Sequence, residues 1–296
     1  MKVDTNRAIE DNGVVTDEHP TLGIIAGNGI LPILVARGAR SAGYRVCCVG
    51  LKNQFESQLP QECDEFAVAG MARIGRWIRL LRRWGAIDAV MVGGVGKKVM
   101  HDPFRMVRTM PDVRGLVLWY RRLRHDRRDA TVLAAIADEL QVAGVTLIDS
   151  TTHIQQHLAG SDVLGSVAPT AMQSDDIAFG WPLLSQTVDL HIGQSIAVRE
   201  GDVLAVEAIE GTAALIDRAG KLCKAKGWTL LKTAASDHDM RADVPSIGVN
   251  TIDQVAAAGC RCIAMGSGRV ILLDAPAVIA AANEAGVALV GVVETQ

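Results

Sequence analysis

The sequence predicts an α/β protein with two α/β domains, an N-terminal Rossmann-like parallel sheet and a C-terminal mixed α/β domain. Strand-like and helix-like segments alternate along most of the chain, which is typical of parallel sheets covered by helices. Hydrophobic residues make up 49% of the 296 residues and aromatic residues only 4%, a balance that favours α/β layers over an all-β sandwich. A chain of this length is expected to form two domains.

In the first unit, short apolar runs alternate with helical patterns, two of which end at Gly43 and Gly85. Glycine just after a helical pattern is a common helix end. The expected strands are 22–26, 45–49, 66–68, 89–92 and 146–148, and the expected helices are 31–42, 72–84, 113–122 and 130–142. The expected boundaries are a flexible tail at 1–20, an N-terminal domain at 21–158, a linker at 159–168 and a C-terminal domain at 169–296.

The second unit has a similar but less regular alternation. The expected strands are 195–198, 203–206, 229–231, 262–264, 270–273 and 288–292, and the expected helices are 212–226, 253–258 and 277–285. Gly266-Ser267-Gly268 resembles a hairpin turn between two of these strands.

Composition excludes several classes. The net charge is −3, so the chain as a whole is not a polycation built for nucleic acid. The six cysteines lie in apolar runs without a regular framework, which indicates reduced thiols and a cytosolic protein. Residues 1–20 lack the apolar stretch of a signal peptide, and no apolar run reaches the length of a membrane span.

The segment 237–248 contains the densest group of reactive side chains. Asp237, His238, Asp239, Arg241 and Asp243 follow a strand-like apolar run. Carboxylates suit a hard cation such as Mg²⁺, and an arginine offers a planar fork to phosphate oxygens. The pattern therefore suggests metal-assisted chemistry on a phosphate ester, although a solvated polar turn has the same composition.

Two glycine loops follow expected strands, Gly27-Asn28-Gly29 and the segment 93–98. The dinucleotide fingerprint fails because Pro32 stands where its third glycine belongs, and the P-loop pattern fails because Lys98 stands where Ser or Thr belongs. Each loop remains a candidate for binding phosphate or uridine. Each is also compatible with a plain tight turn.

Positive charge is concentrated between residues 73 and 128, which contain 15 Lys or Arg against four acidic residues. Arg73, Arg76, Arg79 and Arg83 fall on one stripe of an expected helix and its apolar residues on another. Such segments can lie on anionic lipid headgroups. They can equally be ordinary helices with a core stripe and a solvated face.

Several stretches, taken in order, resemble the LpxI family of UDP-2,3-diacylglucosamine pyrophosphatases. They include Leu22-Gly-Ile-Ile-Ala-Gly-Asn-Gly-Ile-Leu-Pro32, Val206-Glu-Ala-Ile-Glu-Gly-Thr212 and Arg241-Ala-Asp-Val-Pro-Ser-Ile-Gly248. The similarity extends over nearly the whole chain after Thr21. It departs from the family pattern at His191 and Ala213, where the family often has Asp.

The resemblance implies hydrolysis of UDP-2,3-diacylglucosamine to 2,3-diacylglucosamine 1-phosphate and UMP in lipid A biosynthesis, with Mg²⁺ or Mn²⁺ as cofactor. It also implies two α/β domains with the lipid-linked nucleotide sugar between them, and a homodimer. With the basic segments, it predicts a cytoplasmic protein in peripheral contact with the anionic inner membrane and without a nucleic-acid partner. The alternatives are a soluble nucleotide-sugar pyrophosphatase and a nucleotide-binding module without catalysis.

The resemblance also assigns roles to residues. The family's catalytic aspartate corresponds to Asp243 in the Arg-x-Asp-x-Pro pattern. From the residue types we expect Asp243, Asp239, Glu207 and Glu210 as metal ligands. Asp243 could instead position the attacking water, and the two glutamates could instead bind the sugar. The expected substrate-binding residues are Gly27, Asn28, Gly29, Gln194, Thr212, Lys232 and Arg241, with Lys232 and Arg241 neutralising pyrophosphate oxygens.

Overall fold

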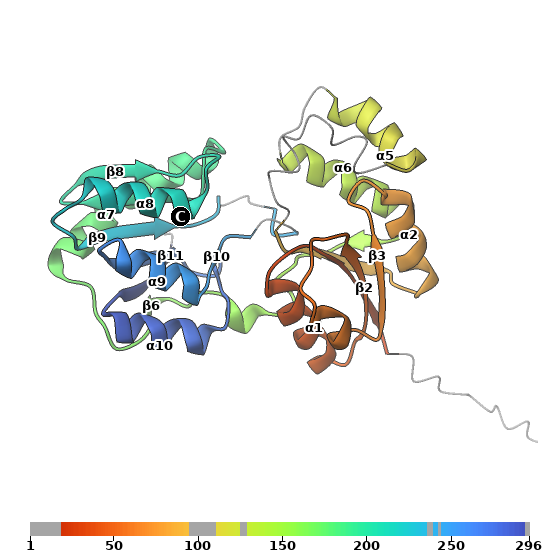
Figure 1. The fold of residues 1–296 in the computed structure, drawn as a ribbon, viewed down its shortest axis with the longest axis horizontal. Coiled ribbons are helices and arrows are strands. Elements are labelled where there is room, and N and C mark those ends of the chain that lie inside the picture. The colour runs from red at the N-terminus through yellow and green to blue at the C-terminus, as the bar shows by residue number, and fades with distance from the viewer. Residues whose placement is uncertain (1–18, 95–110, 125–128, 236–238, 242–243, 294–296) are drawn as a thin grey trace, which may run out of the picture.

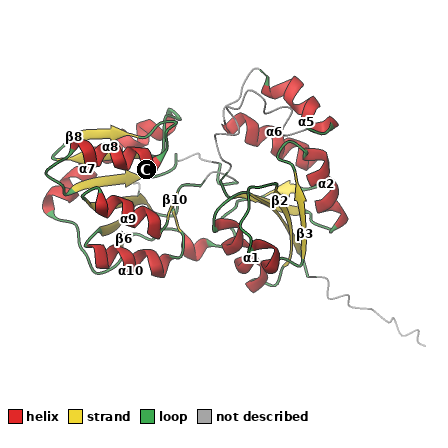
Figure 2. Ribbon diagram, in the orientation of Figure 1, coloured by secondary structure: helices red, strands yellow, loops and turns green. Residues whose placement is uncertain are grey.

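The structure is a computed structural model that describes residues 19–94, 111–124, 129–235, 239–241 and 244–293. It has two α/β domains side by side, each with strands between helices (Figures 1 and 2). This confirms the predicted fold class. Within the described ranges no helix is both long and apolar enough to cross a membrane.

The N-terminal domain is a parallel sheet whose described strands run in the order β3-β2-β1-β4-β5. The strands are β1 (Thr21–Ala26), β2 (Arg45–Leu51), β3 (Glu65–Ala69), β4 (Asp88–Val92) and β5 (Thr146–Leu147). The chain reverses its direction of winding between β1 and β4, which are neighbours in the sheet. In open α/β sheets, ligands bind beyond the carboxyl ends of the strands at this kind of switch point.

Helices cover both faces of this sheet. The helices are α1 (Leu31–Ser41), α2 (Ile74–Arg83), α5 (Val113–Leu118), α6 (Asp129–Val142) and the π-helical turn η2 (Trp119–Leu123), with 3₁₀ turns η1 (Leu59–Glu62) and η3 (Gln155–His157). Helix α1 packs on one face through Ile33 and Val35. Helices α2 and α6 pack on the other through Trp77, Leu81 and Leu140. The apolar stripe of α2 therefore belongs to the core.

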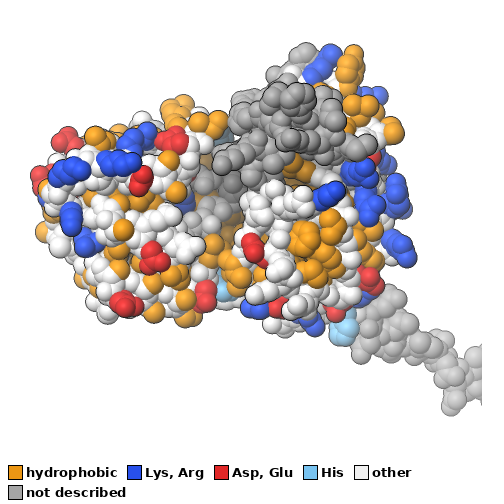
Figure 3. All heavy atoms as spheres, in the orientation of Figure 1, with side chains coloured by type: hydrophobic (Ala, Val, Ile, Leu, Met, Phe, Trp, Pro, Cys, Tyr) orange, Lys and Arg blue, Asp and Glu red, His pale blue; other side chains and the backbone are white. Residues whose placement is uncertain are grey.

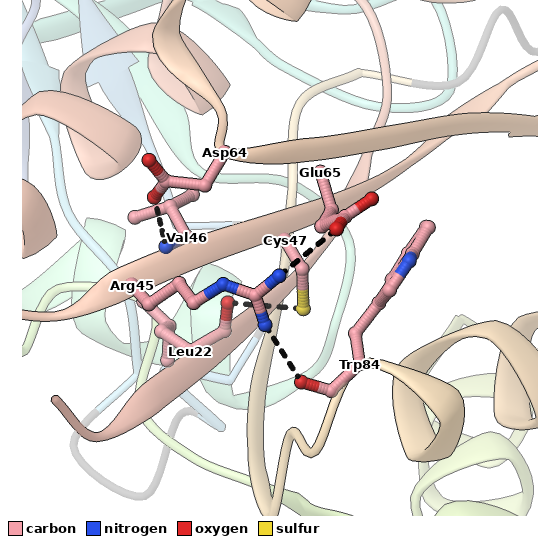
Figure 4. Close-up of polar contacts among 7 residues, drawn as sticks. All are labelled: Leu22, Arg45, Val46, Cys47, Asp64, Glu65 and Trp84. Carbon is pink, nitrogen blue, oxygen red and sulfur yellow. Dashed lines mark hydrogen bonds and ion pairs between the residues drawn. The ribbon is translucent and has the colours of Figure 1, made fainter. Parts of the chain in front are cut away.

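Polar contacts close the amino edge of the N-terminal sheet (Figure 4). The Arg45 guanidinium donates to the Glu65 carboxylate at 2.9 Å and to the Trp84 carbonyl at 3.2 Å. The Asp64 carboxylate accepts from the Val46 amide at 2.8 Å. These partners all come from the beginnings of strands or the end of α2, so this edge satisfies its own polar groups.

The C-terminal domain has a mixed sheet in the order β6-β13-β11-β9-β7-β8 among the described strands. The strands are β6 (Asp162–Val163), β7 (Ser195–Arg199), β8 (Asp202–Val206), β9 (Trp228–Lys232), β11 (Cys260–Gly266) and β13 (Ala288–Val292). Strand β11 pairs in parallel with β9 and β13, whereas β7 pairs antiparallel with β8 and β9. Strand β6 lies within the span expected as a linker and pairs with β13.

The helices α8 (Thr212–Leu222), α9 (Val249–Ala257) and α10 (Ala275–Ala285) pack on one face of this sheet, and α7 (Ala171–Asp189) packs on the other. Helix α7 was not predicted from the sequence, because Gly180 and Pro182 resemble helix breakers. Gly180 instead allows a close approach, since a Cβ there would lie 2.9 Å from a Val198 methyl. A capping box formed by Thr170 and Gln173 begins this helix and was a usable signal.

The hairpin expected at Gly266–Gly268 is wrong. Strand β11 ends at Gly266, and the next strand, β12 (Ile271–Leu272), pairs in parallel with β10 (Ser246–Ile247) in a separate small sheet. The residues between them carry the chain out of the large sheet. The apolar run 270–273 therefore serves the junction between the domains.

The junction is formed by this small sheet (Figure 1). Ile271 is buried in the hydrophobic core that α1 forms with the N-terminal sheet, and Val244 and Leu273 pack against the same core. Ile271 also forms a bridge with Leu158. The second domain thus contributes side chains to the core of the first.

All six cysteines carry free thiols, as the sequence suggested. Burial raises the pKa of Cys47 and that of Cys260 each to about 12. Thiols of this kind stay protonated at neutral pH and are poor nucleophiles.

Candidate functional site

The described parts of the two glycine loops, residues 27–29 and 93–94, meet at the carboxyl edge of the N-terminal sheet, although the sequence offered the loops as separate candidates. Residues 95–98 of the second loop lie outside the described residues. The Gly27 amide donates to the Val92 carbonyl at 2.8 Å, and Asn28 and Gly94 exchange two backbone hydrogen bonds of 2.8 and 2.9 Å. A Cβ on Gly27 would lie 2.7 Å from the carbonyl oxygens of both Gly93 and Gly94. Gly93 also has a φ of 93°, which favours glycine.

Two side chains that follow β2 reach the first glycine loop. The Asn28 side-chain amide donates to the Gln54 side chain at 2.8 Å. The Gly29 backbone amide donates to the Glu56 carboxylate at 3.2 Å. A carboxylate is thus held at a backbone N–H just before α1, where the peptide dipoles of a helix N-terminus favour negative charge.

The acidic loop of the C-terminal domain is tied to the same edge. The Met240 carbonyl accepts hydrogen bonds from the Ser150 backbone amide at 3.0 Å and from the Ser150 hydroxyl at 2.8 Å. Ser150 is buried and lies shortly after β5. Its turn is ordered by Asp149, whose carboxylate accepts from the amide and hydroxyl of Thr151 at 2.7 Å. A loop that leaves β9 therefore lies at the carboxyl edge of the other domain's sheet.

Arg241 and Asp239, both predicted site residues, form a close ion pair. The Arg241 Nε lies 2.7 and 3.0 Å from the two Asp239 oxygens, and Nη2 lies 2.5 Å from the second. The hydrogen bonds to Asp239 raise the pKa of Arg241. Both oxygens of Asp239 are engaged, so a phosphate or metal bound by either residue would have to share the pair or displace one partner.

Lys232, Thr212 and Glu207 gather with Ser195 inside the C-terminal domain. The Lys232 side chain is only 4% exposed. Its Nζ donates to the Thr212 hydroxyl at 2.8 Å and to the Ser195 hydroxyl at 3.1 Å, and lies 3.9 Å from Glu207 Oε2. The Thr212 hydroxyl donates to Glu207 Oε1 at 3.0 Å. This network joins the ends of β8 and β9 to the beginnings of β7 and α8.

The remaining described site residues lie near this network in the chain. Glu210 pairs with Arg218 at 3.0 Å, and Arg218 also donates to the Val206 carbonyl. Gln194 is half-buried, and its backbone carbonyl accepts from the Thr233 amide at 3.1 Å. Asp243 lies outside the described residues.

The predicted metal ligands do not form a cage from their described members. Glu207 and Glu210 each have a basic partner, and Asp239 is bound by Arg241. Among the residues that the structure describes, no group of three or more His, Cys, Asp or Glu side chains gathers as a metal site would require. One buried oxygen, Glu207 Oε2, accepts no hydrogen bond there. Metal binding through Asp243 stays a prediction.

Four residues near the site were not predicted from the sequence, namely Gln54, Glu56, Ser150 and Ser195. The first three follow parallel strands of the N-terminal sheet at their carboxyl ends. Because such ends share one edge, polar residues in these positions were a usable signal. Ser195 had no comparable signal, since a serine that begins a buried strand is common.

The fold and these loops define a two-domain α/β protein with a candidate ligand site at the carboxyl edge of its N-terminal sheet. Models of the LpxI N-terminal domain and the LpxI C-terminal domain match residues 21–157 and 160–290. The chain therefore belongs to the LpxI family.

A curated relative from Caulobacter vibrioides, UDP-2,3-diacylglucosamine pyrophosphatase LpxI, is 32% identical over 279 residues, which is 92% of this chain and 97% of the relative. Similar solved structures include a pyruvate carboxylase from Rhizobium etli, with 11% identity and a TM-score of 0.28 over 61% of this chain and 15% of that one. Another is the biotin carboxylase domain of a single-chain bacterial carboxylase, with 15% identity and a TM-score of 0.23 over 70% of this chain and 55% of that one.

Proposed function

We propose that this protein hydrolyses UDP-2,3-diacylglucosamine to 2,3-diacylglucosamine 1-phosphate and UMP. Family membership and the name of the Caulobacter relative support the reaction. The observation that carries the proposal is the pair of hydrogen bonds from Ser150 to the Met240 carbonyl. They bring the Asp- and Arg-containing loop of one domain to the edge where the other domain offers its glycine loops.

The proposed division of roles follows from the chemistry of each group. The first glycine loop offers the backbone N–H of Gly29 to the UDP end of the substrate once a phosphate replaces the Glu56 carboxylate, which accepts from that N–H in the structure. Arg241 neutralises pyrophosphate oxygens as phosphate replaces part of its contact with Asp239. Electrostatic stabilisation of this kind supplies most of the catalysis in phosphoryl transfer.

Asp243 is proposed to orient the attacking water or to bind the metal ion. Mg²⁺ or Mn²⁺ would neutralise charge that develops on the pyrophosphate. Of the predicted metal ligands, Glu207 is the described carboxylate best suited to support such a site, because one of its oxygens is buried without a hydrogen bond among the described atoms. The proposed role of Lys232 is to hold Glu207, Thr212 and Ser195 together at the end of β9, where the loop that contains Arg241 begins.

We also propose that the protein binds peripherally to the cytoplasmic face of the inner membrane, because its diacylated substrate resides in a membrane. A homodimer is also proposed, from the resemblance to the family. Sedimentation of the full chain in detergent would test the oligomeric state by its mass.

The test is an assay of the purified full chain with UDP-2,3-diacylglucosamine in detergent micelles and Mg²⁺, in which UMP is measured by chromatography. We expect UMP from this substrate and none from UDP-N-acetylglucosamine, which has no acyl chains. Equal turnover of both would favour a soluble nucleotide-sugar pyrophosphatase. Tight binding without UMP release would favour a nucleotide-binding module.

The same assay in ¹⁸O-water identifies the phosphorus attacked. Attack on the phosphorus next to the sugar forms a new P–O bond there and expels UMP. The label should then appear in 2,3-diacylglucosamine 1-phosphate and be absent from UMP. Label in UMP alone would reverse the assignment of Asp243 and the glycine loops to the two ends of the pyrophosphate.

A further inference from the structure

Helix α2 carries a row of arginines on its solvent side. Arg76, Arg79, Arg82 and Arg83 are exposed. The opposite side is core, with Trp77 only 2% exposed. Among the described residues no carboxylate forms an ion pair with Arg79, Arg82 or Arg83, so α2 contributes mainly positive charge to this surface.

The neighbouring segment, α5 and η2, exposes apolar side chains instead. Val113, Leu116, Val117 and Tyr120 are 79%, 49%, 40% and 64% exposed. Their positions are spaced as i, i+3, i+4 and i+7, so they share one face of the helix. Leu118, on the other side, is buried in the core. The guanidinium of Arg124 lies 4.4 Å from the centre of the Tyr120 ring.

The two helices are held together in a fixed arrangement. The Asp112 carboxylate accepts from the Gly115 amide at 2.9 Å, which caps α5, and from the Arg76 amide at 3.0 Å, which joins α5 to α2. A Cβ on Gly115 would lie 2.2 Å from the Ala72 carbonyl oxygen. The contact is therefore too close for any other residue without movement.

A groove of about 580 Å³ lies between the two helices, lined by Arg79, Arg82, Arg83 and Arg114 among others. In the space-filling view, Lys and Arg side chains gather along the right side of the N-terminal domain, and hydrophobic side chains lie above them (Figure 3). We define the basic-apolar face as these four arginines together with Val113, Leu116, Val117 and Tyr120.

We propose that the basic-apolar face binds the surface of an anionic phospholipid bilayer. Lipid phosphates enter the arginine groove, where guanidinium groups offer paired donors, while the apolar residues of α5 and η2 enter the boundary between headgroups and acyl chains. The choice of a bilayer rests on the proposed function, because a diacylated substrate resides in a membrane.

Charge and apolar area together distinguish this occupant from others. Nucleic acid would match the arginines but would leave the four exposed apolar side chains without a partner. A second copy of the same face would bring like charges together. An anionic bilayer matches both the arginines and the apolar row.

The experiment is co-sedimentation of the full chain with vesicles of pure phosphatidylcholine or of phosphatidylcholine with phosphatidylglycerol. We expect binding only to the anionic vesicles, weakened by salt. Changing Arg79, Arg82 and Arg83 together to Gln should weaken it by about 100-fold, because each arginine near an anionic surface contributes roughly fivefold. Changing Val113, Leu116 and Tyr120 to Ser should weaken it at least about tenfold.

Matched controls lie elsewhere on the surface. Lys221→Gln, Lys224→Gln and Lys226→Gln remove the same charge from the C-terminal domain, and Val142→Ser, Leu190→Ser and Leu222→Ser remove comparable exposed apolar groups. Both control sets should bind vesicles like the wild type. The combined variant Arg79→Lys, Arg82→Lys and Arg83→Lys should retain most of the binding, and it therefore reports whether an effect of the Gln variant comes from lost charge or from misfolding.

The outcomes separate this inference from the proposed function. The Gln and Ser variants should hydrolyse substrate in detergent micelles as the wild type does. Wild-type turnover in micelles without vesicle binding would overturn the inference alone, whereas vesicle binding without turnover would overturn only the proposed function. Equal losses in the control variants, or tighter binding to duplex DNA than to anionic vesicles, would also overturn the inference.

Discussion

The two edges of the N-terminal sheet use their polar groups in opposite ways. At the amino edge, Arg45 and Asp64 are paired with groups of the same edge (Figure 4). At the carboxyl edge, Ser150 directs its hydrogen bonds to Met240 of the other domain, and Asn28 and Gly94 of the glycine loops are exposed. Because parallel strands place all their carboxyl ends together, one edge can serve stability while the other serves binding.

The largest effect should come from Asp243, which follows Met240 by three residues in the sequence. Asp243→Ala is expected to lower kcat by about 100-fold or more, as loss of a group that stabilises the transition state commonly does. The melting temperature should change little. Steady-state kinetics in micelles and thermal melts measure the two quantities. Near wild-type turnover would remove Asp243 from the mechanism.

Gly27→Ala should disturb the meeting point of the two glycine loops. The added Cβ would lie 2.7 Å from two carbonyl oxygens, and overpacking of this kind costs about 1–3 kcal/mol. We expect a lower melting temperature and lower affinity for UMP by calorimetry. Gly94→Ala is the matched control, because a Cβ there meets nothing within 4 Å. If both variants behaved alike, the close packing of the loops would not matter for binding.

Ser150→Ala tests the tie between the domains. The variant removes the hydrogen bond from the Ser150 hydroxyl to the Met240 carbonyl but keeps the one from the Ser150 backbone amide. The free energy of unfolding should therefore fall by about 1 kcal/mol. If the loop is held in its working position by this bond, kcat should fall about fivefold. Thr152→Ala, which removes a hydroxyl bond to Asp149 within the same turn, should leave kcat unchanged. If kcat fell equally in both variants, the turn itself would matter rather than the hydrogen bond between the domains.

The smallest effect belongs to the amino edge. The Arg45 and Glu65 side chains are 40% and 43% exposed, and an exposed pair contributes about 1 kcal/mol or less. Glu65→Gln should therefore change the free energy of unfolding by no more than this and leave kcat as in the wild type. Urea denaturation and kinetics measure these effects. A large fall in kcat would show that the two edges are coupled.

Sequence patterns predicted most of the N-terminal sheet, since its strands are apolar runs punctuated by glycine. They failed where tertiary packing overrides local preference. Helix α7 contains Gly180 and Pro182, and Gly180 fits a close contact with β7 that no local pattern reveals. The segment after Gly266 leaves one sheet for another because Ile271 is buried in the core of the other domain.

For the candidate site, the sequence suggested residue types but could not predict their arrangement. It offered the glycine loops as two alternatives, and the exchange of backbone bonds between Asn28 and Gly94 makes them one feature. The sequence assigned Lys232 to phosphate, which stays a prediction, and the structure adds that Lys232 Nζ donates to the Thr212 and Ser195 hydroxyls. The direction in which a side chain points depends on how the strands pair, and the spacing of residues along the chain does not determine that pairing.

Hydrogen exchange tests the central claim most directly, namely that the carboxyl edge and the loop docked on it form the substrate site. The Asp243→Asn variant, with and without UDP-2,3-diacylglucosamine in micelles, would be compared at each backbone amide. The account predicts slower exchange with substrate at Gly29, Gly94, Ser150 and Arg241, and unchanged exchange at Val46 near the amino edge. Protection at the amino edge with none at the carboxyl edge would contradict it.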